Sequence, residues 1–151
     1  MIPPVYKQTR NWDCSNYASL IALQRLGIQV DESYMLQDKD ITYQMVEADL
    51  VKDGKIKGLV KLSTPNVIDI WLKKGHYILT GTSLLSFDSV RHLPHLQAFS
   101  GDSAHYFCIV ANMGDKWKIQ DSQGTNFADK WCWYVKKADF AKLKACWRFD
   151  I

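Results

Sequence analysis

Hydrophobic residues run almost all the way round one stretch near the start of the chain. From Ser15 to about Leu26, apolar side chains occupy most positions, and Gly27 follows. A helix without a polar face lies in the middle of a domain rather than on its surface. A glycine placed just after the last apolar turn commonly ends a helix. The pattern therefore predicts a buried central helix over residues 14–27.

Three further helices are expected before residue 75, separated by turn and cap signals. They cover about 34–39, 42–52 and 65–74, with Asp31 or Ser33 as the N-cap of the first and Pro65 near the first turn of the third. Asp53-Gly54 is a turn signal after the second helix. The segment 55–62 is either a loop or a short strand.

After Gly75 the pattern changes to strands. Strands are expected at about 76–82, 104–112, 117–121, 131–136 and 145–150, with a hairpin turn at 113–116 and a short helix at 138–143. The long segment 83–101 is expected to be a loop. Because helices dominate the first half and antiparallel strands the second, the sequence predicts an α+β fold.

Composition narrows the class of protein without naming it. The chain has 151 residues, 47% hydrophobic and 23% charged, which fits one globular domain over residues 1–151. Its net charge of +3 comes from scattered Lys and Arg, so nucleic acid is not an expected partner. The N-terminus has no signal-peptide pattern, and no apolar run is long enough for a membrane span. We therefore expect cytoplasmic synthesis and no membrane partner; a role outside the cell would need another route of release.

Cys14 stands where a polar loop becomes the central helix. Exposed N–H groups and the positive end of the helix dipole favour the thiolate form of a cysteine at such a position. Gln8, six residues earlier, is a candidate side-chain donor to an oxyanion. Trp12 and Asp13 flank the thiol and are candidates to line a cleft, although Asp13 also suits the helix N-cap.

The other cysteines and most histidines are expected to have structural roles. Cys108, Cys132 and Cys146 lie in strand-like or aromatic surroundings and form no CxxC pair, so core positions are expected. His92 and His95 lie close together, but no cysteine or acidic cluster supports a metal site there. His76 is likewise not expected to be catalytic. No metal and no cofactor is expected.

His105 and Asp121 complete a candidate triad. His105 begins a strand, and Asp121 ends the strand that returns from a tight turn near Gly114. Residues at these positions of an antiparallel hairpin lie close to opposite one another. A carboxylate orients an imidazole, whose other nitrogen can then take a proton from a thiol. Asp102 is a weaker alternative to Asp121.

These residues resemble the papain-like cysteine peptidases. The resemblance rests on Gln8-x5-Cys14 at a helix start, on the distant His105, and on the stretch 121–127 with the aromatic strand after it, which is similar to the family's Asn-Ser-Trp-Gly segment. An acid in third place is similar to the bacteriocin-processing branch, the double-glycine leader peptidases. The resemblance covers roughly residues 6–34 and 100–140. Two positions differ from that branch: Ser15-Asn16 stands where Gly-Pro is usual, and Gln123 replaces a tryptophan that would shield the His–acid pair.

The resemblance implies both a fold and a reaction. A helical half carrying Cys14 would pack against a β half carrying His105 and Asp121, with the active site in the cleft between them. The thiolate would attack the carbonyl of a peptide, protein or peptidoglycan-peptide substrate, and Gln8 with the Cys14 N–H would hold the oxyanion. His105 would protonate the leaving amine.

Three other functions remain open on the same residues. Transglutaminase-like acyl transferases or deamidases also use Cys, His and Asp, with a similar helix after the cysteine. Cell-wall amidases of the CHAP kind resemble Asp13-Cys14-Ser15. Gln8 favours the peptidase among these. A non-enzymatic binding domain is disfavoured because every triad member is present.

Overall fold

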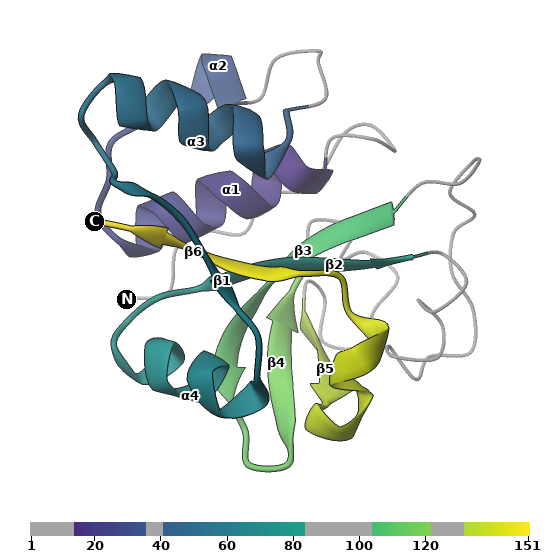
Figure 1. Cartoon of the computed structure of the whole chain (residues 1–151). Helices are drawn as coiled ribbons and strands as arrows, with labels where there is room; N and C mark the ends of the chain where they lie inside the picture. The colour runs from purple at the N-terminus through teal and green to yellow at the C-terminus, as the bar shows by residue number, and fades with distance from the viewer. Residues whose placement is uncertain (1–13, 36–40, 84–103, 122–131) are drawn as a thin grey trace.

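A computed structural model describes residues 14–35, 41–83, 104–121 and 132–151. In these residues six strands form one antiparallel sheet in the order β1-β6-β2-β3-β4-β5 (Figure 1). The strands are β1 (Gly58–Leu62), β2 (Ile78–Ser83), β3 (Ala104–Asn112), β4 (Lys116–Gln120), β5 (Cys132–Lys136) and β6 (Cys146–Asp150). The helices are α1 (Cys14–Arg25), α2 (Glu32–Met35), α3 (Tyr43–Lys52), α4 (Pro65–Lys73) and the 3-10 helix η2 (Lys137–Lys142). The α+β class is confirmed.

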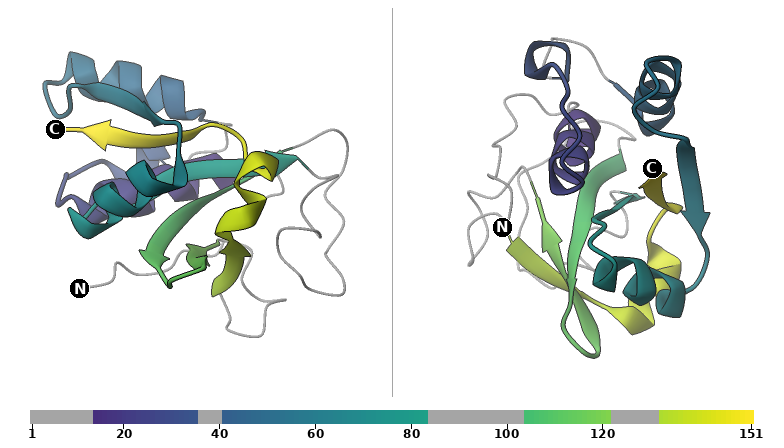
Figure 2. Two further views of the ribbon diagram at one scale, coloured as in Figure 1. Left: turned by 60° about the horizontal axis from the view of Figure 1, so that its bottom comes forward. Right: turned by 90° about the vertical axis from the view of Figure 1, so that its left-hand side faces the viewer.

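Helices cover both faces of the sheet (Figure 2). On one face, α1, α2 and α3 bury their apolar side chains against sheet residues that include Leu79, Cys108 and Phe149. On the other face, α4 and η2 pack over Phe107, Ile109 and the remaining members of a second apolar cluster. The sheet is therefore the middle layer, and residues that alternate along each strand serve two separate cores.

The central helix α1 is buried as predicted. Every residue from Cys14 to Leu23 is buried, and the helix packs mainly on β3. Gly27 adopts φ +72°, and the N–H of Ile28 returns to the carbonyl of Leu23 at 3.0 Å. This glycine-dependent turn closes the C-terminus of the helix and ends it two residues before Gly27.

Caps confirm the other helix starts. Thr42 caps α3 by accepting the N–H of Met45, and Thr64 caps α4 just before Pro65. Of the two cap candidates for α2, Asp31 is the residue used, because its carboxylate accepts the Ser33 N–H at 2.9 Å. The described part of α2 ends at Met35.

The sheet differs from the predicted segregation of helices and strands in one respect. One of its strands, β1, comes from the helical first half of the chain, and the final strand β6 lies between β1 and β2. Side-chain alternation identifies a strand but does not say which strand lies beside it, so this order was not predictable. Among the described residues, no helix combines the length and apolar character needed to cross a membrane.

Candidate functional site

A β-bulge determines how the β3–β4 hairpin presents Asp121. Near the turn Asn112 pairs with Trp117, but beyond an irregularity at Val110 the pairing continues as Ile109 with Ile119. Continued by two residues, this register puts Asp121 opposite Phe107 and on the face that carries His105. Without the extra residue, Asp121 would fall opposite Cys108 and point to the other face.

His105 and Asp121 form a buried ion pair. Nε2 of His105 lies 2.8 Å from Oδ1 of Asp121, and both side chains are fully buried. The sequence led us to expect the two residues close to opposite each other, and the structure makes them diagonal neighbours two residues apart in register. An imidazole reaches across this diagonal, so the contact is made despite the offset.

Trp133 holds the second oxygen of Asp121. Its indole N–H donates to Oδ2 at 2.9 Å from the neighbouring part of β5. The Trp133 ring meets Phe107 edge-on with centroids 5.0 Å apart, and Phe107 in turn lies 5.9 Å from the His105 ring. Sequence reasoning missed this residue, although the aromatic strand after Asp121 was the available signal. The tryptophan that shields the His105–Asp121 pair therefore lies on strand β5.

Cys14 reaches the same place from α1. On β3, the described pairing with β4 ends at Cys108. Tyr106 lies two residues before Cys108 on the same strand, and its backbone N–H donates to the Cys14 sulfur at 3.4 Å. The thiol is 3% exposed. Because α1 begins at Cys14, its own N–H has no intrahelical acceptor.

Ser15 and Asn16 anchor this end of α1. The Ser15 hydroxyl donates to the Ile41 carbonyl, and the Asn16 side-chain oxygen accepts the Ile41 N–H, both at 2.8 Å and both buried. The two residues therefore bind the N-terminus of α1 to Ile41, which lies just before α3. Ser15 and Asn16, the two positions that differ from the bacteriocin-processing branch, thus stabilise the attachment of α1 to Ile41.

His105 interacts with both Cys14 and Asp121. Burial alone lowers the pKa of His105, but the charge of Asp121, its hydrogen bond, and a hydrogen bond and charge from Cys14 outweigh burial and raise that pKa to about 10. Nε2 of His105 is engaged by Asp121, and Cys14 acts on the same imidazole. The carboxylate of Asp121 therefore favours the imidazolium form of His105.

The remaining cysteines and His76 lie elsewhere. Burial raises the pKa of the Cys108 thiol, which donates to the Ala18 carbonyl, and burial also raises that of Cys146 to about 11. Cys132 is half-buried on β5, so it is less deeply buried than the expected core position. His76 packs edge-on against Trp71, and burial, with Arg148 nearby, lowers its pKa.

Several candidates lie outside the described residues. These are Gln8, Trp12, Asp13, His92, His95, Asp102 and Gln123. The oxyanion role of Gln8 and the cleft-lining roles of Trp12 and Asp13 stay predictions. Within the described ranges, no group of three or more His, Cys, Asp or Glu side chains is placed to hold a metal ion.

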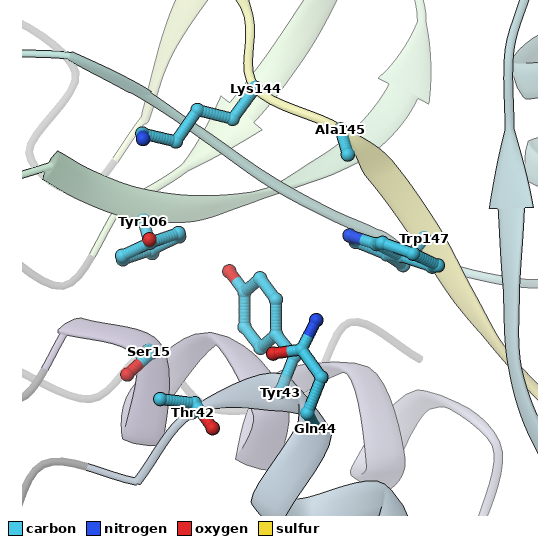
Figure 3. Close-up of a pocket in the computed structure, with 8 residues that line it drawn as sticks. All are labelled: Ser15, Thr42, Tyr43, Gln44, Tyr106, Lys144, Ala145 and Trp147. Atoms are coloured by element: carbon cyan, nitrogen blue, oxygen red, sulfur yellow. The ribbon is translucent and has the colours of Figure 1, made fainter.

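A pocket of about 430 Å³ lies between the start of α1, the start of α3 and residues 144–147 (Figure 3). Its walls include Ser15, which follows Cys14, and Tyr106, whose N–H binds the Cys14 sulfur. The other lining residues are Thr42, Tyr43, Gln44, Lys144, Ala145 and Trp147. Side chains from the start of α3 and from residues 144–147 thus face one another across this pocket.

Neither known protein families nor curated proteins provide an identity: no family model matches this chain, and no curated protein matches it. The geometry of Cys14, His105 and Asp121 is therefore the basis for a proposed function.

Proposed function

We propose that this protein is a cysteine peptidase that cleaves a peptide-type amide bond through Cys14, His105 and Asp121. The observation that carries the proposal is the position of His105, which interacts with a thiol on one side and a carboxylate on the other. The three residues come from a helix start, a strand start and a strand end far apart in sequence. Such a buried row of nucleophile, base and orienting acid is the arrangement that thiol acyl transfer requires.

The reaction follows from the charges of these groups. The Cys14 thiolate attacks the substrate carbonyl carbon, and the carbonyl electrons move to oxygen. The Cys14 N–H and the predicted donor Gln8 stabilise that oxyanion. As the tetrahedral intermediate collapses, the C–N bond breaks and His105 gives its proton to the leaving amine. Water then adds to the thioester, giving a proton to His105, and the C–S bond breaks to release the acid.

The papain-like fold is part of the proposal. It is supported by a Cys-bearing helix, α1, packed on β3 of an antiparallel sheet, and by a His–Asp pair on the β3–β4 hairpin. It is also supported by the position of Cys14, whose sulfur accepts the backbone N–H of Tyr106, the residue after His105.

Selective alkylation of Cys14 tests the proposal. Cys132 is half-buried, whereas Cys14 is 3% exposed, so accessibility alone would make Cys132 the faster thiol. We expect iodoacetamide at pH 6 to modify Cys14 first, because only a thiolate reacts well there. Mass-spectrometric mapping over time gives the order. In His105→Gln the preference should reverse; equal reaction of Cys14 and Cys132 in the native protein would refute an activated thiol.

A non-enzymatic binding domain is the second candidate, and the deep burial of Cys14 and His105 is the observation that favours it. It predicts slow alkylation and no turnover. Hydrolysis and transfer differ in their products: cleavage shortens a peptide, whereas a transglutaminase or deamidase releases ammonia from glutamine without shortening it. Incubation with peptidoglycan alongside peptide libraries separates a wall hydrolase from a protein peptidase.

A further inference from the structure

The pocket beside Cys14 has a chemical character that suggests what it recognises. Three of its eight lining residues are aromatic: Tyr43, Tyr106 and Trp147. Lys144 is the one charged residue among the eight. An apolar interior with few polar groups is typical of a small-ligand or side-chain pocket, and its volume of about 430 Å³ lies within the usual range.

The floor of the pocket is fixed by hydrogen bonds. The Tyr43 hydroxyl donates to the Thr80 carbonyl at 2.9 Å, which ties the start of α3 to β2. The Tyr43 and Tyr106 rings meet edge-on with centroids 5.3 Å apart. These contacts hold both tyrosines in one arrangement, so the apolar surface they offer is already formed before a ligand arrives.

The backbone of Lys144 is equally well held. Its N–H donates to the Gly81 carbonyl at 2.7 Å, and its carbonyl accepts the Thr80 hydroxyl at 3.1 Å. The side chain is exposed, and among the described residues no acidic group forms an ion pair with its ammonium. Figure 3 shows Lys144 with Ala145 and Trp147 on the wall opposite Tyr43 and Gln44. An anchored lysine at the edge of an aromatic pocket thus supplies the positive charge of this pocket.

We propose that this pocket binds a substrate side chain that has an apolar stem and a terminal carboxylate, with the stem between Tyr43, Tyr106 and Trp147 and the carboxylate on Lys144. This inference rests on the proposed peptidase function, because two lining residues are neighbours of the thiol: Ser15 follows Cys14, and Tyr106 donates its backbone N–H to the Cys14 sulfur. A glutamate side chain in a protein and the free carboxylate of a peptidoglycan stem peptide share this chemistry.

Cleavage of matched peptides tests the preference. A positional-scanning library of quenched fluorescent peptides should show one position near the cut bond at which Glu exceeds Gln in kcat/KM by about tenfold or more, the effect expected of one charge-assisted hydrogen bond. Digests of purified peptidoglycan form the second arm and distinguish the wall peptide from the protein source. Lys144→Met should bring the Glu and Gln peptides to equal kcat/KM, and Lys144→Glu should favour Lys at that position.

Lys142→Met is the matched control. Lys142 lies two residues earlier, is paired with Asp139 at 3.3 Å, and does not line the pocket. It should keep the full Glu preference. A Glu to Gln ratio that is unchanged in Lys144→Met, or equally reduced in Lys142→Met, would overturn the proposal.

Binding without turnover separates this proposal from that of the peptidase. In Cys14→Ala, millimolar N-acetylglutamate amide should shift the NMR signal of the Trp147 indole N–H more than N-acetylglutamine amide does, and Lys144→Met should remove the difference. If this difference appears but no peptide is cleaved, the pocket assignment stands and the peptidase fails. If peptides are cleaved with no preference and no shift, the pocket assignment fails and the peptidase stands.

Discussion

Nε2 of His105 lies 2.8 Å from Oδ1 of Asp121, and both side chains are closed off from solvent. At this distance in a buried site, the carboxylate interacts more strongly with an imidazolium than with a neutral imidazole. Most of the chemistry proposed for Cys14 depends on that preference, and so do the first three predictions below.

Asp121→Asn should keep the shape of the pair and remove its charge. We expect kcat/KM to fall by about a hundredfold or more, the scale of general acid–base catalysis, because the imidazolium loses its counter-charge. Alkylation of Cys14 at pH 6 should slow as well. Asp115→Asn, in the exposed hairpin turn, is the control and should change neither rate. Full activity in Asp121→Asn would show that Asp121 does not orient the base.

Trp133→Phe removes the indole N–H from Oδ2 of Asp121 while keeping an aromatic ring against Phe107. The loss of a hydrogen bond to a buried carboxylate should cost about 1–3 kcal/mol in the free energy of unfolding, measured in urea. Activity per folded molecule should also fall several-fold.

Trp117→Phe is the matched control for that variant. Trp117 donates its indole N–H to Asp69 at 2.7 Å, a bond of the same kind that is remote from Cys14. It should lose comparable stability and no activity per folded molecule. Equal loss of activity in both variants would mean that Trp133 acts only through stability.

The His105 pair should make stability depend on pH in the alkaline range. The pKa of His105 rises from 6.5 to about 10 on folding. Its contribution to the free energy of unfolding is therefore complete below pH 6.5, declines above that pH, and is lost as the pH passes about 10. Urea unfolding at pH 6, 8 and 10 should show this decline in the native protein. His105→Gln should show a shallower decline over the same range; parallel curves would contradict the raised pKa.

Gly81→Ala should disturb the site through packing alone. A methyl group there would lie 2.6 Å from the His105 carbonyl oxygen and 2.7 Å from the Tyr106 ring, so β3 must shift. Overpacking of this kind costs about 1–3 kcal/mol, and we expect kcat/KM to fall because both neighbours belong to the site. Gly54→Ala meets no atom within 4 Å and should affect stability only. A fully active, stable Gly81→Ala would refute this close packing.

Much of the fold could be predicted because it is encoded locally. A few neighbouring residues decide each of these features: the apolar character of α1, the starts of α3 and α4 at Thr42 and Thr64, and the turn at Gly114. The triad spacing was also informative, because a hairpin returns residue 121 toward residue 105 whatever its exact register. The fold class and the approach of Asp121 to His105 followed from these features, whereas the packing of the Cys14 helix against that hairpin was expected from the family resemblance.

The details of the site depend on contacts that a sequence does not display. The bulge at Val110 decides which face Asp121 points to, yet no glycine or proline marks it. Trp133 reaches Asp121 only because β5 pairs with β4. The N–H of Tyr106 meets Cys14 where the described β3–β4 pairing ends. Each contact is set by strand order and register, which residue periodicity leaves undetermined.

The place of β6 in the sheet also imposes an order of assembly. β1 and β2 both pair with β6, so residues 146–150 must be present before those two strands belong to one sheet. Trp147 and Lys144 come with the same segment. The wall of the pocket that carries Lys144 and Trp147 is therefore complete only when β6 has joined the sheet, and the proposed choice of substrate would depend on this strand as well as on Cys14, His105 and Asp121.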